Sequence, residues 1–278
     1  MLRLVDSLSL PGDSAKANED SFAHGEAAAL VMDGATMLGD PLMPGPSDAA
    51  WIASFGARRL MAHLGDQEPK KALRSAMADA EKSFGALRLR EMEAQWQIPC
   101  ASVCLAAAHD KGLEFLWLGD CGALVAQGED VTVVGETIAK RAEESRRARK
   151  IAQEKNVSSA APGVRAQFMD HLRAARANVN SGSYWLFTPD KRAAAHAQRR
   201  IVKVEAGALL LLASDGFLAL ASDYGAYDAA GLIAAAKTKG LAAMGNELRA
   251  IENADANGDK FARFKKSDDA TALLLEVG

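Results

Sequence analysis

More than any other feature of the sequence, short apolar runs that end at an aspartate restrict the folds that this chain can adopt. Four aspartates stand at or next to the end of such a run: Asp33, Asp120, Asp215 and Asp268. A carboxylate at the end of a buried strand costs free energy unless it is paired or bound to a metal. Where neighbouring strands run antiparallel, the end of one lies beside the start of the next. The pattern therefore predicts that these carboxylates converge at one end of the sheets.

The apolar runs are short, bounded by turns and partly alternating, which favours strands over helices. Expected strands cover residues 2–10, 28–32, 102–108, 113–118, 124–126, 131–134, 201–204, 208–213 and 270–277. Helical spacing of apolar residues predicts helices over 48–64 (after Ser47 as the cap), 70–96, 228–237 and 241–255. Two long helices in succession do not suit a regular βαβ winding. They indicate an α+β protein with its helices on the outside of the sheets.

Residues 136–156 differ from the rest of the chain because they are strongly basic and hold few large apolar side chains. Their cations are Lys140, Arg141, Arg146, Arg147, Arg149, Lys150 and Lys155. A solvated helical face is the simpler interpretation, and a flap that faces a phosphate or a partner is the alternative. No internal repeat or low-complexity tract marks a boundary. We therefore expect one domain over residues 1–278, with a basic helical flap-like insertion at about 136–180.

The overall charge and hydropathy of the chain exclude several classes of function. A net charge of −3 and a pI near 6.0 provide no global attraction to nucleic acid or to an anionic membrane. The longest apolar stretch, residues 208–213, is too short to cross a bilayer, and no secretory signal is visible. The three cysteines show no metal-ligand or redox spacing. We expect a cytoplasmic monomer that binds neither nucleic acid nor membrane.

The acidic cluster predicts a site for a hard divalent cation. Converging carboxylates repel one another and raise each other's pKa unless cations neutralise them. Oxygen ligands without a His or Cys cluster favour Mg²⁺ or Mn²⁺ over Zn²⁺. The five histidines are scattered, and neither a Gly-x-Ser-x-Gly motif nor a Walker-type loop occurs. A site based on metal ions is therefore favoured over one based on a covalent nucleophile.

Taken in order, five short motifs resemble those of the metal-dependent protein phosphatase 2C family, also called PPM. They are Asn18-Glu19-Asp20, Asp33-Gly34, Gly119-Asp120, Ser214-Asp215-Gly216 and Asp268-Asp269-Ala270-Thr271. Each motif is common by itself, but their order and their attachment to apolar strands are fairly specific. The resemblance spans almost the whole chain and is to a divergent, bacterial-type member. It implies a four-layer α/β/β/α sandwich of two antiparallel sheets flanked by helices.

The resemblance also implies a metal-dependent phosphoserine and phosphothreonine phosphatase that uses two or three Mn²⁺ or Mg²⁺ ions. In the family's arrangement, Asp33 bridges two ions and the carbonyl of Gly34 adds a ligand. Glu19 then lies on one ion, and Asp215 and Asp268 lie on the other. A water activated between the two ions attacks phosphorus, so that no covalent nucleophile is needed.

The resemblance assigns further roles and shows two departures. Asp20 holds a metal-bound water, and Asp120 joins Asp215 at the position of a third ion. The Arg that usually grips the substrate phosphate is replaced by Ala15, where Lys16 could serve only as a point charge. The His expected to protonate the leaving oxygen is replaced by Ala35-Thr36.

Three hypotheses follow from these residues. The first is a phosphatase acting on a phosphoprotein that a serine/threonine kinase has modified. The second, motivated by the missing Arg and His, is a weak or inactive phosphatase-like module that binds phosphoproteins and regulates a partner. The third treats the acids as loop caps and surface ion pairs around an unrelated α/β core. The set of candidate ligands favours the first.

Overall fold

The computed structural model describes residues 1–135, 146, 149–150, 153–154, 158–161 and 164–278. Its strands form two antiparallel five-stranded sheets. Sheet A contains, in spatial order, β1 (Leu2–Leu10), β10 (Ala270–Val277), β9 (Leu209–Ala213), β6 (Gly122–Gln127) and β7 (Asp130–Val134). Sheet B contains β2 (Asp20–His24), β3 (Ala28–Gly34), β4 (Ala101–His109), β5 (Gly112–Leu118) and β8 (Gln198–Val202).

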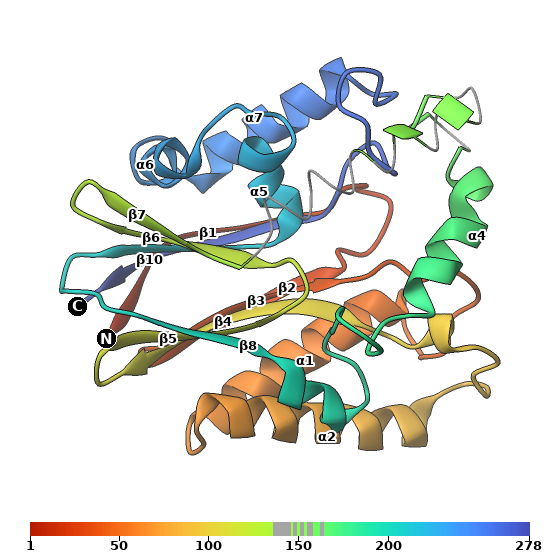
Figure 1. Cartoon of the computed structure of the whole chain (residues 1–278), viewed down its shortest axis with the longest axis horizontal. Coiled ribbons are helices and arrows are strands. Elements are labelled where there is room, and N and C mark those ends of the chain that lie inside the picture. Colours follow the sequence, from red (N-terminus) through yellow and green to blue (C-terminus); the bar gives the residue numbers. More distant parts are fainter. Residues whose placement is uncertain (136–145, 147–148, 151–152, 155–157, 162–163) are drawn as a thin grey trace.

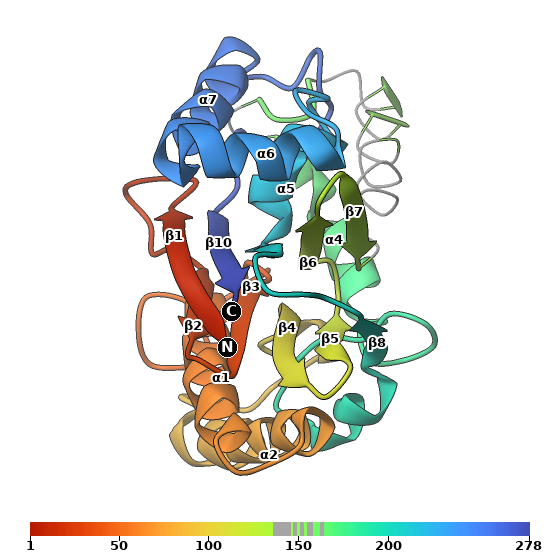
Figure 2. The same ribbon diagram turned by 90° about the vertical axis from the view of Figure 1, so that its left-hand side faces the viewer.

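The two sheets are stacked, and helices cover their outer faces (Figure 1). On sheet B lie α1 (Asp48–Leu64) and α2 (Pro69–Leu87); on sheet A lie α5 (Asp215–Ser222), α6 (Ala229–Lys239) and α7 (Leu241–Ala254). Figure 2 shows the same order of layers in the perpendicular view. The predicted α+β class and the four-layer α/β/β/α sandwich are therefore confirmed.

The central strands are apolar on both faces because each face meets a different layer. In β3, Leu30 and Met32 pack toward α1 and α2, whereas Ala29 and Val31 pack into the core between the sheets. Such strands appear in the sequence as continuous apolar runs, not as alternating ones. The inter-sheet core also contains Phe115, which is fully buried.

Helix α1 begins where the sequence predicts it. The side chain of Ser47 accepts hydrogen bonds from the backbone N–H groups of Ala49 and Ala50, which is the arrangement of an N-cap. The prediction of one helix over residues 70–96 was wrong at its C-terminal end. Helix α2 ends at Leu87 because the backbone turns away to pair with the loop between β3 and α1, where Leu89 N donates to Leu42 O.

Several described elements were not predicted, among them the short 3₁₀-helix Lys191–His196. Strand β2 is short and largely polar, so its sequence has no apolar signal. Helix α5 follows β9 almost at once, and its apolar residues continue the apolar run of the strand. No helix in the described part of the chain is both long and apolar enough to span a membrane.

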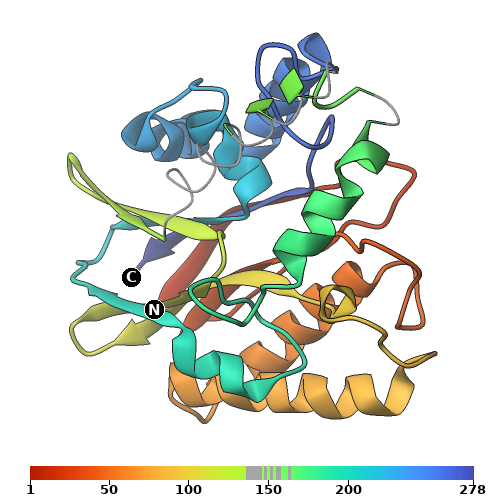
Figure 3. The same ribbon diagram turned by 45° about the vertical axis from the view of Figure 1, so that its right-hand side comes forward.

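The predicted basic insertion is described only in part. Lys140, Arg141, Arg147 and Lys155 lie outside the described residues. Within 136–180, the helix whose bounds are described is α4 (Arg165–Arg176), and the described residues 146, 149–150 and 153–154 are also helical. In Figures 1 and 3, α4 runs obliquely beside one end of the sandwich, from the side of the α5–α7 layer toward sheet B.

Candidate metal centre

Strand register brings the first carboxylates together in sheet B. Asp20 of β2 is the direct antiparallel partner of Asp33 in β3, and Asp33 is in turn the partner of Ser102 in β4. The hydroxyl of Ser102 donates a hydrogen bond to Asp120 Oδ1, at the end of β5. Residues that pair directly across a ladder project from the same face of the sheet. Three acids that are up to 100 positions apart therefore lie at one sheet end.

Asp33, Asp120 and Asp215 form the centre of the cluster. One carboxylate oxygen from each lies within 4.8 Å of one from each of the others, close enough for a single metal ion to be shared. Asp215 is the first residue of α5, two positions after the end of β9 in sheet A. A negative charge at this end of a helix is favourable because the backbone N–H groups there are unpaired. The convergence predicted for these three residues is what the structure shows.

Asp20 is held by the loop that carries Asp215. Ser214 Oγ donates to Asp20 Oδ2 at 2.7 Å and accepts from Thr271 N at 2.9 Å. The other oxygen, Asp20 Oδ1, is buried without a hydrogen-bond partner among the described residues. A buried carboxylate oxygen without a partner is costly, and a cation or a bound water relieves that cost.

Glu19 and Gly34 lie at the junction of β2, β3 and α1. Both oxygens of Glu19 accept hydroxyl hydrogen bonds, one from Thr36 and one from Ser47. Gly34 N donates to Glu19 O at 3.0 Å, and a Cβ at position 34 would lie 2.4 Å from Ala49 O. Only glycine permits this approach of the backbone of β3 to α1.

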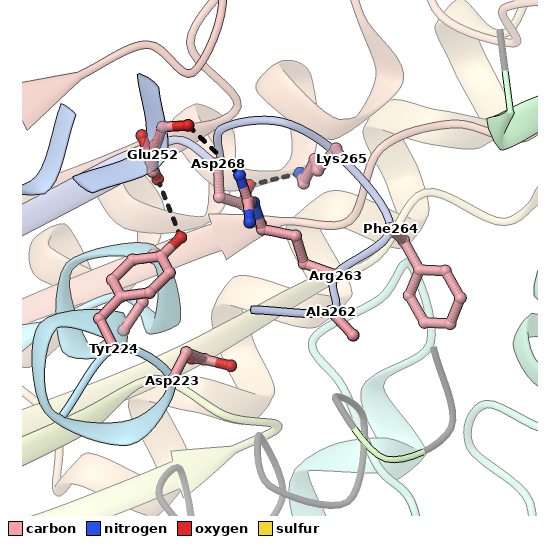
Figure 4. Close-up of a pocket in the computed structure, with 10 residues that line it drawn as sticks. Asp223, Tyr224, Glu252, Ala262, Arg263, Phe264, Lys265 and Asp268 are labelled. Atoms are coloured by element: carbon pink, nitrogen blue, oxygen red, sulfur yellow. Dashed lines mark hydrogen bonds and ion pairs between the residues drawn. The ribbon is translucent and has the colours of Figure 1, made fainter. Parts of the chain in front are cut away.

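Asp268 carries a cation of its own. Lys265 Nζ forms an ion pair with Asp268 Oδ1, as Figure 4 shows. Lys265 and Asp268 line a small cavity of about 50 Å³ beside α5. Burial by itself would lower the pKa of Lys265, but the carboxylates of Asp268, Asp33 and Asp215 outweigh it, so the pKa of Lys265 is raised. The negative charge of Asp268 therefore acts on Lys265 together with the charges of Asp33 and Asp215, which are two of the three central acids.

The cluster is short of positive charge. Removal from water raises the pKa of Asp33, and the carboxylates of Asp215, Asp20, Asp268 and Asp120 raise it further. Burial also raises the pKa of Asp20, which the Ser214 hydrogen bond opposes and the charges of Asp268, Asp269 and Asp215 support. Oxygen ligands, mutual repulsion and the unpartnered Asp20 Oδ1 together fit a hard divalent cation such as Mn²⁺ or Mg²⁺.

Lys16, the cation that the sequence offered for phosphate binding, lies away from the carboxylate cluster, and so do the nearby helix cations Arg58 and Arg59. Lys16 is mostly exposed, and its ammonium lies 3.6 Å from a carboxylate oxygen of Asp13. Arg58 bonds to Ser54, and Arg59 pairs with Asp79 on the outer helices. None of these contacts reaches the carboxylate cluster, so the assignment of Lys16 to substrate phosphate stays a prediction.

Sequence reasoning missed several residues that shape the site. Ser102, Ser214 and Asp269 position the acids, with Asp269 accepting from Gly12 N and Glu19 N at 2.6 Å each. Asp269 and Ser214 stand inside the motifs themselves, so they could have been found there. Lys265 had no comparable signal, because a lysine in a polar loop usually faces solvent.

Comparison with known proteins identifies the fold. No family model matches the sequence, and no curated protein matches it. Solved structures do match. The serine/threonine phosphatase PstP/Ppp of Mycobacterium tuberculosis is 16% identical, with a TM-score of 0.59, over 99% of this chain and 98% of that chain. The PPM Ser-Thr phosphatase MsPP of Mycobacterium smegmatis, in complex with cacodylate, is 13% identical, with a TM-score of 0.56, over 99% and 100%.

The catalytic domain of the serine/threonine protein phosphatase PstP has been solved with two manganese ions. It is 17% identical to this chain, with a TM-score of 0.54, over the full length of both chains. At these identities the likeness is one of fold. The chain has the fold of the PPM, or phosphatase 2C, serine/threonine phosphatases along nearly its whole length.

Proposed function

We propose that this chain is a metal-dependent phosphatase that hydrolyses phosphoserine and phosphothreonine in proteins. The observation that carries the proposal is the convergence of Asp33, Asp120 and Asp215 within 4.8 Å. These residues lie on a fold shared with serine/threonine phosphatases, one of them solved with manganese. The fold alone would not specify an activity. The carboxylates at this particular place in it make phosphate-ester hydrolysis the best-supported reaction.

Asp33, Asp120 and Asp215 would hold Mn²⁺ or Mg²⁺. Glu19, Asp268 and the Gly34 carbonyl would complete the ligand set that the resemblance implies. Such ions lower the pKa of a bound water and offset the charge of phosphoryl oxygens. The expectation of two or three ions is retained as part of this proposal. The chain itself has to place the ligands, hold the water and bind the substrate.

Asp20 is suited to orienting the attacking water. Its Oδ2 is fixed by Ser214, which leaves Oδ1 to accept a hydrogen bond from that water. Glu19 would be a ligand that the protein itself orients, because the hydroxyls of Thr36 and Ser47 each donate to one of its oxygens. Glu19 fixes the loop after Asp33 to the start of α1 and adds negative charge to the site.

Protonation of the leaving oxygen is assigned to solvent. Thr36 follows Ala35 after the Asp33-Gly34 motif, and its hydroxyl donates to Glu19. An aliphatic hydroxyl is a poor acid near neutral pH, so Thr36 does not replace an imidazole. We therefore expect a modest maximum rate with alkyl phosphates and a faster one with aryl phosphates, whose leaving groups need less protonation. The substrate follows from the same proposal: a phosphoprotein produced by a serine/threonine kinase.

The test is hydrolysis of phosphoserine and phosphothreonine peptides by the purified chain, with Mn²⁺ or Mg²⁺ titrated from zero. Activity should require the ion and fall at least a hundredfold in D33N and D215N. D79N is the matched control, since Asp79 pairs with Arg59 and His63 on the outer helices. Activity that persists in chelator, or that survives both changes, would contradict the proposal. Metal binding and phosphopeptide binding without turnover would instead favour the regulatory module.

A further inference from the structure

A phosphatase site needs a cation that binds the substrate phosphate, and position 15, where a cation was expected, is an alanine. Lys16 beside it is exposed and near Asp13. Metal ions neutralise part of a phosphate dianion, but orientation requires directional donors. The planar guanidinium of arginine supplies two parallel N–H groups, whereas lysine supplies a point charge. The described residues around the cluster must therefore supply the donor from another element.

Helix α4 is held against the metal centre at both of its ends. Near its start, Phe168 is fully buried and packs edge-on against Phe264, with ring centroids 5.4 Å apart. Near its end, Arg173 donates to Leu38 O at 2.9 Å and Arg176 donates to Ala35 O at 3.3 Å. The helix thus connects the loop that follows Asp33-Gly34 to the loop that precedes Asp268.

The first residue of this helix, Arg165, is a partly buried cation with no assigned partner. Its guanidinium makes no hydrogen bond or ion pair among the described residues. Burial lowers the pKa of Arg165, while the negative charges of Asp268 and Glu19 oppose that shift. The Phe168–Phe264 contact, three residues along α4, independently places this end of the helix beside the loop that carries Lys265 and Asp268. Even a partly buried guanidinium without a partner costs free energy, and an anion that binds it relieves that cost.

Lys265 brings a second cation to the same place. It directly follows Phe264, so the Phe168–Phe264 contact holds the start of α4 beside the backbone that carries Lys265. The ammonium pairs with Asp268 and lines the cavity drawn in Figure 4. A divalent ion on Asp268 would compete with Lys265 for the same carboxylate oxygen. The displaced ammonium would remain at the edge of the site, where it can meet an anion.

We propose that Arg165 and Lys265 form the subsite that binds the phosphate of the substrate, in place of the cation missing at position 15. This inference rests on the proposed function. Arg165 supplies the two parallel donors that orient the phosphate, and Lys265 adds a point charge from the side of Asp268. The phosphate would thus be bound from the insertion and the last loop, not from the N-terminal segment.

The experiment is calorimetric titration of inorganic phosphate into the Mn²⁺-loaded protein and its variants. R165A should weaken phosphate binding by about tenfold or more, because a charge-assisted hydrogen-bonded pair is lost. R165K should recover part of the loss, since it keeps the charge without the fork. R192A is the matched control, because Arg192 is an exposed arginine that pairs with Asp190. Equal phosphate affinity in R165A and R192A would overturn the subsite.

Three further readouts separate this subsite from a general loss of structure or activity. Titration of Mn²⁺ alone should give R165A an affinity no weaker than wild type, since Arg165 repels the ion. Thermal melting should report that R165K remains folded, and a folded R165K with unchanged phosphate affinity would contradict the role of the guanidinium. With phosphopeptide, R165A should raise KM more than it lowers kcat.

The outcomes also separate the subsite from the proposed function. An active wild-type protein whose R165A variant keeps its KM and its phosphate affinity would leave the phosphatase standing and overturn the subsite. A protein with no turnover that binds phosphate through Arg165 would support the subsite and count against the phosphatase.

Discussion

Asp20 and Asp33 are direct partners across the β2–β3 ladder, so two carboxylates project from one face of sheet B at adjacent positions. Like charges directly opposite one another destabilise a strand pair. Here the pKa of each is raised, first by burial and then by neighbouring carboxylates. Under the proposed function, this pair lowers the stability of the metal-free protein and supplies two carboxylates to the metal site.

The first prediction concerns Asp33. D33N keeps the shape of the side chain and removes a buried charge from a cluster of carboxylates. In chelator we expect the variant to melt higher than wild type, by about 2–5 °C, and to gain little on adding Mn²⁺. D79N should melt lower, because hydrogen bonds from His63 and Arg59 outweigh burial and lower the pKa of Asp79. A D33N variant that melts lower in chelator would contradict the account.

The pH dependence of the metal-free protein follows from the same two acids. A carboxyl whose pKa is raised on folding binds more protons when folded, so its stabilising effect is greatest in acid. Stability contributed by Asp20 and Asp33 is present below their ordinary pKa and is lost as pH rises through the raised values. The melting temperature measured in chelator should fall as pH rises above the ordinary carboxyl pKa, and the fall should be smaller in D33N. With Mn²⁺ added, the melting temperature should instead rise with pH, because protons compete with the ion for the carboxylates.

A second prediction concerns Ser214, which links Asp20 in sheet B to Thr271 in sheet A. S214A leaves the buried Thr271 N–H without this acceptor, which should cost about 1–3 kcal/mol of unfolding free energy. The pKa of Asp20 should also rise further, because burial would no longer be opposed by that hydroxyl. Denaturant unfolding and Mn²⁺ calorimetry measure the two effects. S75A is the control. Ser75, on the outer helix α2, donates a hydrogen bond to Gln67, and the loss of this bond should leave Mn²⁺ affinity unchanged.

Gly216 provides the third prediction. A Cβ at this position would lie 2.0 Å from Asp269 O, which is backbone and cannot move without shifting Asp268. G216A should therefore destabilise the protein and weaken Mn²⁺ binding together. Gly85 is the matched glycine, since it lies exposed in α2 with nothing within 4 Å of a Cβ. G85A should stabilise by roughly 0.5–1 kcal/mol, because glycine is unfavourable inside a helix. Similar melting curves for the two variants would refute the close approach.

Lys265 provides the fourth prediction. K265M keeps the length of the side chain and removes the ammonium that pairs with Asp268. Mn²⁺ affinity should rise by about threefold to tenfold, since one competing cation and its repulsion are lost. Phosphate affinity of the loaded protein should fall in the same variant. K266M, one residue along the chain, is the control for the loss of a positive charge. Lower Mn²⁺ affinity in K265M would show that the lysine supports the ion.

Local patterns in the sequence were sufficient to predict most of the helices and strands. Ser47 and the apolar spacing after it determine α1, because a helix cap and an amphipathic face are properties of neighbouring residues. The runs before Asp33 and Asp120 determine β3 and β5 in the same way. Where the local signal was ambiguous, prediction failed: α5 continues the apolar run of β9, and α2 ends at Leu87 through a tertiary contact at Leu42.

The sequence by itself determined the identity of the acids and their attachment to strand ends, since both depend on adjacent residues. Only the tertiary structure decided which of them meet. The group of Asp33, Asp120 and Asp215 depends on the register of strands far apart in the chain and on the stacking of two sheets. The same holds for Arg165, because the Phe168–Phe264 contact places the start of α4 beside the loop of Lys265. The pairing of Lys265 with Asp268, three residues along the chain, is local by comparison. Contacts between distant segments produce no periodic pattern in the sequence of either segment, so the sequence does not show which segments meet.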